Sequence, residues 1–152
     1  MVERYVRDVE VAGSNPVAPK FFPSLEPVFS HFSSASWRVV RVAEQESRNH
    51  NDYFIGAEHL LVALLEERDP EVIAALHKAG IDVHELHAQA RRSIGLGSDR
   101  LWEGIIVTPR VRKIVTLAEQ AATGREIEPV DLLQALRAEG GSTAAALMRE
   151  RH

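Results

Sequence analysis

From residue 32 onward, the apolar residues of the chain recur at the three- and four-residue spacing of amphipathic helices. Capping residues bound these stretches: Ser33 or Ser34 can cap the first, and Thr108-Pro109 combines a cap with a proline in the first turn. The predicted helices cover about residues 33–48, 57–67, 70–80, 83–94, 108–122, 129–140 and 142–149. The pattern therefore predicts an all-α protein.

The chain carries this pattern twice. The matching segments are the A-E-Q runs at 43–45 and 118–120, the Leu-Leu pairs at 60–61 and 132–133, and the runs 72–78 and 143–149. A repeat of this length indicates one supersecondary unit duplicated, with each copy burying its apolar face against the other. We expect one domain made of copy one at 32–94, a linker at 95–107 and copy two at 108–152. Copy two has no counterpart of the helix predicted at 83–94.

Residues 1–31 differ from the rest, because four prolines interrupt any helical period. We expect this segment to be mostly disordered. Its VAGSNPVAP run also looks like the translated T-arm of a bacterial tRNA gene, which would place the true start downstream, at a codon such as that of Val17 or Val28. The alternative is a genuine linker, and only the expressed N-terminus decides between the two.

Composition narrows the class of protein. The chain has 152 residues, of which 45% are hydrophobic, so it can bury a core. Its formal net charge of -4 gives no general attraction to nucleic acid or to anionic membranes. It has no cysteine, which excludes disulfides and cysteine-bound zinc. It has no apolar run of the ~20 residues that span a bilayer, and no apolar secretory signal. We expect a cytoplasmic protein.

The motifs at the repeat starts and second helices resemble a known family. IGAEHLLVALLEE at 55–67 is similar to the second helix of the N-terminal repeat domain of Clp chaperone ATPases, with the ClpC unfoldases as the nearest branch. The family's I-G-T-E-H-L-L motif is nearly intact there and is reduced to IEPVDLL in copy two. Its F-T-x-R-A motif corresponds to FSSAS at 32–36 and VTPRV at 107–111. The resemblance covers about residues 32–149.

The resemblance implies a role in binding rather than in catalysis. Domains of this family receive adaptors and substrates in front of ATPase modules, and some recognise phosphorylated arginine. The chain contains no G-x-x-x-x-G-K-[ST] loop to hold a nucleotide phosphate, and no nucleophile and base at a meaningful spacing. We therefore expect no enzyme and no cofactor. The partners would be a Clp-family unfoldase, an adaptor or a substrate protein, and the chain would act as an adaptor, a decoy or a docking subunit.

The resemblance also implies a phosphoarginine site made of the Thr of F-T-x-R and the Glu of I-G-T-E-H. In copy one these positions are Ser33 and Glu58. A helix N-terminus with a hydroxyl suits a phosphate, and a carboxylate accepts hydrogen bonds from a guanidinium. Two supporting polar residues of the family are Ala35 and Ala57 here. The alternative is that Ser33 only caps its helix and Glu58 is only an acidic residue in a first turn.

A second, degenerate site is expected in copy two. Thr108 and Arg110 remain there, but the Glu position is Val130, which accepts no hydrogen bond. We expect this copy not to bind phosphoarginine, and its VTPRV segment to serve capping and packing. If the missing last helix leaves an apolar face, copy two could form a homodimer through it.

Three other groups of residues have simpler explanations. His59 is expected to be buried and hydrogen-bonded. His84 and His87 lack the i, i+4 spacing of zinc hydrolases, so no metal site is predicted. The basic residues at 110–113 could attract an acidic partner, although a solvated face is more usual.

A helical DNA-binding regulator is the alternative function. Two short helices around Gly140-Gly141 loosely resemble a helix-turn-helix. The net charge of -4 and the absence of a basic helix argue against nucleic acid as a partner.

Overall fold

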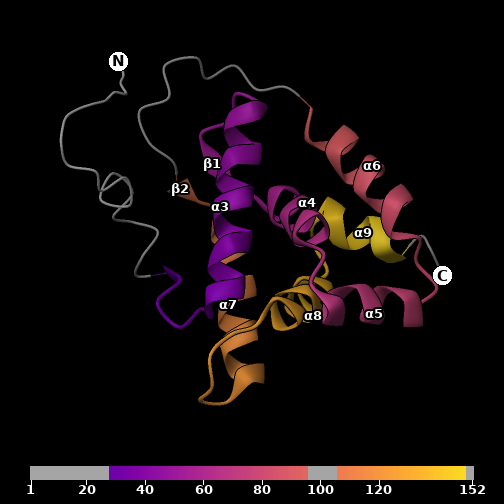
Figure 1. Ribbon diagram of the computed structural model, residues 1–152. Coiled ribbons are helices and arrows are strands. Elements are labelled where there is room, and N and C mark those ends of the chain that lie inside the picture. Colours follow the sequence, from indigo (N-terminus) through magenta and orange to yellow (C-terminus); the bar gives the residue numbers. More distant parts are fainter. Residues whose placement is uncertain (1–27, 96–105, 150–152) are drawn as a thin grey trace.

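The computed structural model describes residues 28–95 and 106–149 (Figure 1). Two very short strands accompany the helices. The elements are α3 (Ser34–Asn49), β1 (Phe54–Ile55), α4 (Ala57–Glu67), α5 (Pro70–Lys78), α6 (Val83–Ile94), β2 (Ile106–Val107), α7 (Pro109–Ala122), α8 (Pro129–Glu139) and α9 (Thr143–Arg149). The prediction of an all-α fold with two helical repeats is confirmed. No helix in the described ranges is both long and apolar enough to cross a membrane.

The helix ends lie where the capping residues predict them. Asp69 accepts hydrogen bonds from the first-turn amides of α5, which begins at a proline. Asp82 does the same for α6. Gly140 ends α8 with a φ of 75°, a left-handed conformation that glycine adopts without strain. Each boundary is thus set by contacts within a few residues of the sequence.

The two copies interlock at the segments that precede their helices. β1 and β2 pair in parallel, with Ile55 opposite Val107. An isolated parallel bridge joins Phe32 to Ile127 in the same way. In both places, the segment before the first helix of one copy lies beside the segment before the second helix of the other. The two repeats therefore form one body.

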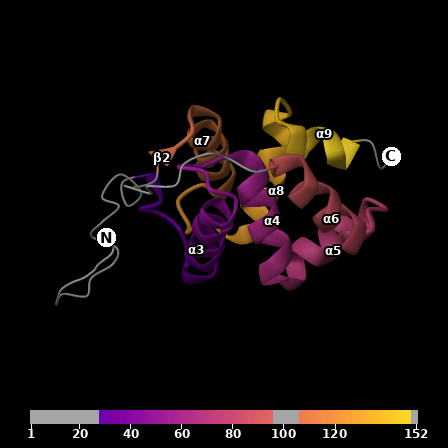
Figure 2. The ribbon, with the colours of Figure 1, turned by 90° about the horizontal axis from the view of Figure 1, so that it is seen from above.

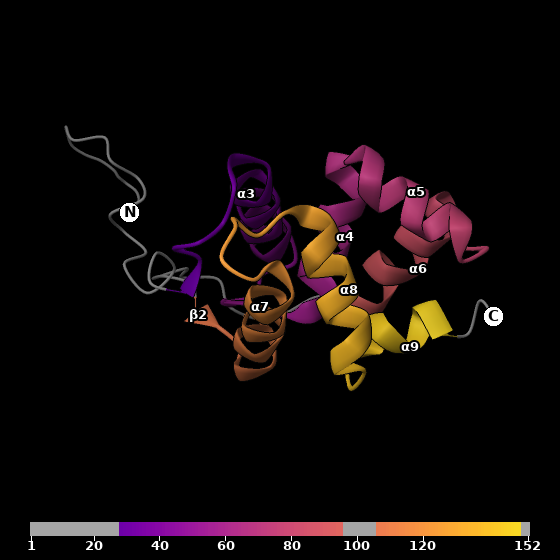
Figure 3. The same ribbon diagram turned by 90° about the horizontal axis from the view of Figure 1, so that it is seen from below.

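The second helices of both copies form the centre of the domain. Figures 2 and 3 show α4 and α8 between α3 and α7 on one side and α5, α6 and α9 on the other. Every residue of α4 from Leu60 to Leu65 is at most 2% exposed. A helix that is apolar all round belongs in a core, which is why this leucine-rich segment is buried on all sides rather than on one stripe.

The short helix α9 packs against α4, α6 and α8. Its Ala144, Ala145 and Met148 are buried. Among the residues that the structure describes, the exposed large apolar side chains are Tyr53 and Ile106, and neither belongs to α9. Tyr53 directly precedes β1 and Ile106 is the first residue of β2, and the Ile106 amide donates to the Tyr53 carbonyl.

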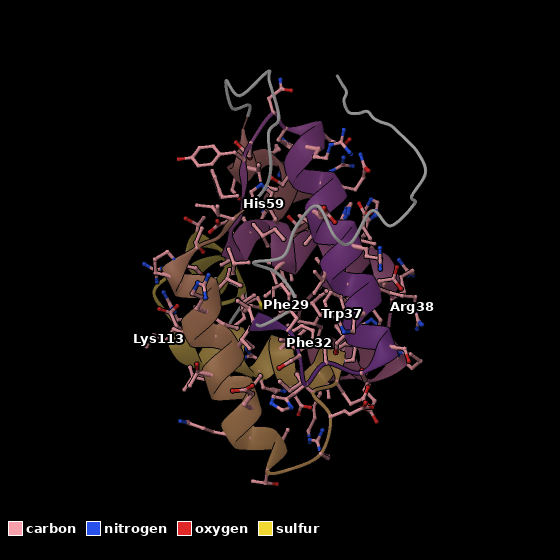
Figure 4. All side chains as sticks on the ribbon, turned by 90° about the vertical axis from the view of Figure 1, so that its left-hand side faces the viewer. Phe29, Phe32, Trp37, Arg38, His59 and Lys113 are labelled. Carbon is pink, nitrogen blue, oxygen red and sulfur yellow. The ribbon has the colours of Figure 1, made fainter. Side chains whose placement is uncertain are left out.

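The packed domain begins before residue 32. Phe29 is 1% exposed and lies against Phe32 and Trp37, with ring centroids 4.8 and 5.9 Å away (Figure 4). Residues 28–31 were predicted to belong to the tail, because they follow Pro27 and are too few to show the aromatic pairing in the sequence. The predictions for residues 1–27, and most of the linker prediction, fall outside the described residues.

Candidate functional site

Two junctions join the copies, and each contains one of the predicted hydroxyl residues. The Ser33 junction consists of Ser33, Ile127 and Glu128. The Thr108 junction consists of Thr108, Ile55 and Gly56. The Ser33 amide donates to the Ile127 carbonyl at 3.1 Å, and the Thr108 amide donates to the Ile55 carbonyl at 3.3 Å. The backbone is thus arranged alike in both places.

Each hydroxyl also caps its own helix. The Ser33 oxygen accepts from the Ser36 amide at 3.2 Å, and the Thr108 oxygen accepts from the Val111 amide at 3.2 Å. Ser and Thr are favoured at this position because their oxygens satisfy an amide that has no partner within the helix. The expected capping role of both residues is present, and it leaves open what their hydroxyl protons bind.

The structure does not bring Ser33 and Glu58 together. Within the described ranges, no hydrogen bond joins them: Ser33 lies against copy two, and Glu58 accepts from the Ala144 amide of α9 at 3.3 Å. The physical reason is the length of α3. Its 16 residues span about 24 Å and carry the chain away from Ser33 before β1 and α4 begin (Figure 1).

Glu58 instead belongs to the side of the domain where Thr108 lies. It follows Ile55, the acceptor of the Thr108 amide, by three residues and stands in the first turn of α4. Arg110 stands in the first turn of α7, just after Thr108. Glu58 and Arg110 therefore stand in the first turns of two helices, α4 and α7, whose leading strands are paired.

Arg110 is held against the turn between α8 and α9. One of its guanidinium nitrogens donates to both oxygens of Glu139, at 3.1 and 2.9 Å. A side chain at Gly141 would collide with this guanidinium. Although burial raises it, the pKa of Glu139 is held below its usual value by the Gly141 amide and by Arg110. The ion pair holds the Arg110 guanidinium near the start of α7, with its charge balanced by the Glu139 carboxylate.

The Ser33 junction has a different chemistry. The Ser33 hydroxyl donates to a Glu128 carboxylate oxygen at 3.0 Å, and the Ser36 hydroxyl donates to the Ile127 carbonyl at 2.7 Å. Glu128 stands where copy one has Gly56, and Val130 stands where copy one has Glu58. Sequence reasoning did not single out Glu128. The signal available was a charged residue at the glycine position of the family motif.

A buried histidine supports the turn before α4. His59 Nδ1 accepts from the Gly56 amide at 2.9 Å, and Nε2 lies 2.9 Å from an Asp52 oxygen (Figure 4). Burial lowers the pKa of His59, although the hydrogen bond to Asp52 works in the opposite direction. The ring is therefore neutral with its proton on Nε2. The prediction of a buried, hydrogen-bonded histidine is confirmed.

Copy two holds the same turn with an acid. Asp131 accepts from the Glu128 amide at 2.9 Å and from two nitrogens of Arg125 at 2.7 and 2.9 Å. Burial raises the pKa of Asp131. The Arg125 guanidinium and the Glu128 amide lower it by more than that, so the pKa lies below its usual value. The backbone amide before the helix is thus satisfied by a different residue type in each copy.

The remaining polar groups form no further centre in the described ranges. No group of three or more potential metal ligands occurs there. His87 is paired with Glu66, Nε2 to carboxylate oxygen, at 3.0 Å. Arg112 and Lys113 are exposed on α7, near the start of the helix (Figure 4).

Interlocked helical repeats, with polar residues gathered at helix N-termini, define a helical-repeat binding domain. The chain belongs to the Clp repeat (R) N-terminal domain family, whose sequence model matches residues 31–151. The resemblance inferred from the two motifs is confirmed by this match.

The relatives are chaperone and protease subunits. The chain is 27% identical over 134 residues to the chloroplastic chaperone protein ClpC of Pisum sativum, covering 86% of this chain and 14% of that protein. It is 29% identical over 124 residues to a ClpA homolog, an ATP-dependent Clp protease ATP-binding subunit, of Cyanidium caldarium, covering 80% and 14%. It is 27% identical over 95 residues to the chaperone protein ClpB of Oceanobacillus iheyensis, covering 62% and 12%. The chain thus spans about a seventh of these relatives or less.

Proposed function

We propose that the protein is a non-catalytic protein-binding module of the Clp chaperone-protease system, with a ligand site at the Thr108 junction. One observation carries the proposal. The surviving hydroxyl and arginine of copy two, and the surviving glutamate of copy one, stand at the starts of two helices whose leading segments are hydrogen-bonded to each other.

The proposed ligand is a phosphorylated arginine side chain. Its phosphate would lie at the N-terminus of α7, where the Thr108 hydroxyl, the dipole and Arg110 favour an anion. Its guanidinium nitrogens would donate to Glu58. In the part of the chain that the structure describes, the Thr108 hydroxyl proton has no acceptor, so it can be donated to a ligand. Glu58 is partly exposed and can be reached.

The partners are proposed by class. A module with one ligand site would deliver a marked protein to an unfoldase as an adaptor, sequester it as a decoy, or dock on a full-length Clp unfoldase as a subunit. Self-association through copy two is a further proposal. Ile106 is exposed in β2, directly before copy two, so Ile106→Ser should abolish a dimer that sedimentation detects in the wild type.

Calorimetric titration of the full chain with free phosphoarginine tests the site. We expect binding of one ligand per chain in the wild type. Hydrogen bonds to charged groups contribute roughly 1.5–3 kcal/mol, so Thr108→Val and Glu58→Gln should each weaken binding about tenfold or more. Glu58→Gln keeps an oxygen that can accept from the Ala144 amide, so it separates ligand binding from folding.

The matched control is Ser33→Ala at the other junction, which should bind as the wild type does. No binding by the wild type would contradict the proposal. Binding that Ser33→Ala abolishes and Thr108→Val leaves intact would place the ligand at the Ser33 junction. That result would also contradict the proposal.

A further inference from the structure

The two junctions have the same backbone arrangement and differ at the residue that follows the carbonyl acceptor. At the Thr108 junction this residue is Gly56, and at the Ser33 junction it is Glu128. The position matters because its side chain, where there is one, reaches the hydroxyl of the opposite copy. Glu128 does so, with its carboxylate 3.0 Å from the Ser33 hydroxyl.

Glu128 leaves the Ser33 hydroxyl without a free hydrogen-bonding role. The Ser33 oxygen accepts from the Ser36 amide, and its proton is donated to the carboxylate. Ser33 is itself only 5% exposed. The carboxylate also places a negative charge near the N-terminus of α3, where the dipole favours an anion. An incoming phosphate would meet a satisfied hydroxyl and a like charge.

At the Thr108 junction, no carboxylate of the described residues is hydrogen-bonded to the hydroxyl. Gly56 has no side chain, and a Cβ there would lie 3.3 Å from the Phe54 ring and 3.6 Å from His59 Nδ1. Gly56 has a φ of -103°, so its backbone is open to other residues. The glycine is therefore not needed for an unusual backbone; it leaves this position of the Thr108 junction without a side chain.

We infer that Glu128 is a built-in occupant that closes the Ser33 junction to anionic ligands, so that the protein takes one such ligand per chain. This inference rests on the proposed function of the Thr108 junction. A domain with two open junctions could hold two modified side chains of one client and gain affinity by linkage, whereas a domain with one cannot. Residue 128 therefore adds to Ala35 and Val130, which lack the polar groups of the family motifs, in making this domain monovalent.

A reciprocal exchange tests the inference with inorganic phosphate as the probe. Phosphate is titrated into the full chain while backbone amide resonances are followed by NMR. Ser34 and Ala35 report on the Ser33 junction, and Arg110 and Val111 report on the Thr108 junction. In the wild type we expect phosphate-dependent shifts at Arg110 and Val111 only.

The variants should redistribute these shifts. Glu128→Gly removes the occupant and should add saturable shifts at Ser34 and Ala35. Glu128→Ala is a second version that keeps the backbone less flexible. Gly56→Glu should abolish the shifts at Arg110 and Val111, and Gly56→Ala controls for adding a Cβ there.

The outcomes separate the two proposals. Saturable shifts at Ser34 and Ala35 in the wild type, or their absence in both residue-128 variants, overturn the inference. Shifts that appear only in the residue-128 variants, with none at Arg110 in any protein, support the inference and contradict the proposed ligand site. Shifts at Arg110 that survive Gly56→Glu show that an occupant at this position does not close a junction, which also overturns the inference.

Discussion

The Ser33 and Thr108 junctions share one backbone arrangement but differ in the hydrogen bonds of their side chains. In both, a capping residue donates its amide to an isoleucine carbonyl of the other copy. At Thr108 the hydroxyl proton has no acceptor among the described residues, whereas at Ser33 a carboxylate accepts it. The backbone contacts hold the two copies together, so changing them would destabilise the fold. The side chains around these backbone contacts can differ between the copies with a smaller loss of stability.

The turns before α4 and α8 also share a backbone requirement and differ in the side chain that meets it. An amide before each second helix must have an acceptor because it is buried or half-buried. His59 supplies the acceptor in copy one and Asp131 supplies it in copy two. The requirement belongs to the backbone, and any side chain with an acceptor at that position can meet it. The supporting residue then follows: Asp52 holds the histidine and Arg125 holds the aspartate.

The largest expected loss of stability tests whether the two copies unfold together. Leu61→Ala and Leu133→Ala each remove a fully buried side chain from the matching position of the two central helices. Each should lower the free energy of unfolding by about 3 kcal/mol, since the cavity adds to the lost burial. Chemical denaturation followed by circular dichroism would measure both. Two separate transitions in either variant would show that the repeats are independent.

The next largest change in stability compares His59 and Asp131, which accept the amide before each second helix. His59→Ala and Asp131→Ala should each cost about 2 kcal/mol, because a backbone amide and a charged partner lose their hydrogen bonds. Their pH dependence should differ. The pKa of His59 is lowered in the folded state. As the pH falls below about 6.5, the unfolded chain therefore binds a proton at this histidine before the folded chain does, and wild-type stability falls.

Asp131 acts in a lower pH window. Its pKa is depressed in the folded state, so its contribution is present above the ordinary aspartate value and is lost as the pH falls through the folded value. Denaturation at several pH values would resolve the two. If His59→Gln keeps the whole loss of stability just below pH 6.5, the assignment to His59 is wrong.

A rebuilt second junction gives an intermediate effect. Glu128→Gly combined with Val130→Glu restores a glycine and a carboxylate at the Ser33 junction. We expect two phosphoarginine ligands per chain by calorimetry, the new one about tenfold weaker than the first because the arginine of the family motif is Ala35. Val130→Glu alone, which leaves Glu128 in place, is the control and should still bind one. Two ligands in that control would show that Glu128 does not matter.

The smallest expected effect concerns the A-E-Q run of copy one. Burial raises the pKa of Glu44 to about 7, although Arg41 and Arg48 lower it. The unfolded chain loses this proton near pH 4.5, so the charged form destabilises the fold increasingly as the pH rises toward 7. Glu44→Gln should therefore stabilise the protein at neutral pH by about 1 kcal/mol after allowance for solvent screening.

Thermal unfolding at pH 5 and pH 8 would measure this effect. Glu119→Gln, at the matching position of copy two, controls for the chemistry of the substitution. A stabilisation by Glu44→Gln that is as large at pH 5 as at pH 8 would count against the titration of Glu44 as its cause.

The helices and the repeat could be predicted because their signals are local. Asp69, Asp82 and Thr108 cap helices through amides two or three residues away, so the sequence contains both partners of each contact. The register of the repeat follows from the Leu-Leu pairs, since these leucines are buried in both central helices. The aromatic turn at Phe29 was missed, because its partners cluster only when the chain folds back on α3.

The sequence by itself determined the helices, the duplication and the residue types available for binding. Only the tertiary structure decided which of them meet. Ser33 and Glu128 are 95 residues apart in the chain and hydrogen-bonded in the fold, whereas Ser33 and Glu58, 25 residues apart, share no hydrogen bond in the described structure. Caps and turns depend on neighbours along the chain, but a helix as long as α3 separates its two ends in space. The pairing across the junctions therefore depends on how the two copies dock.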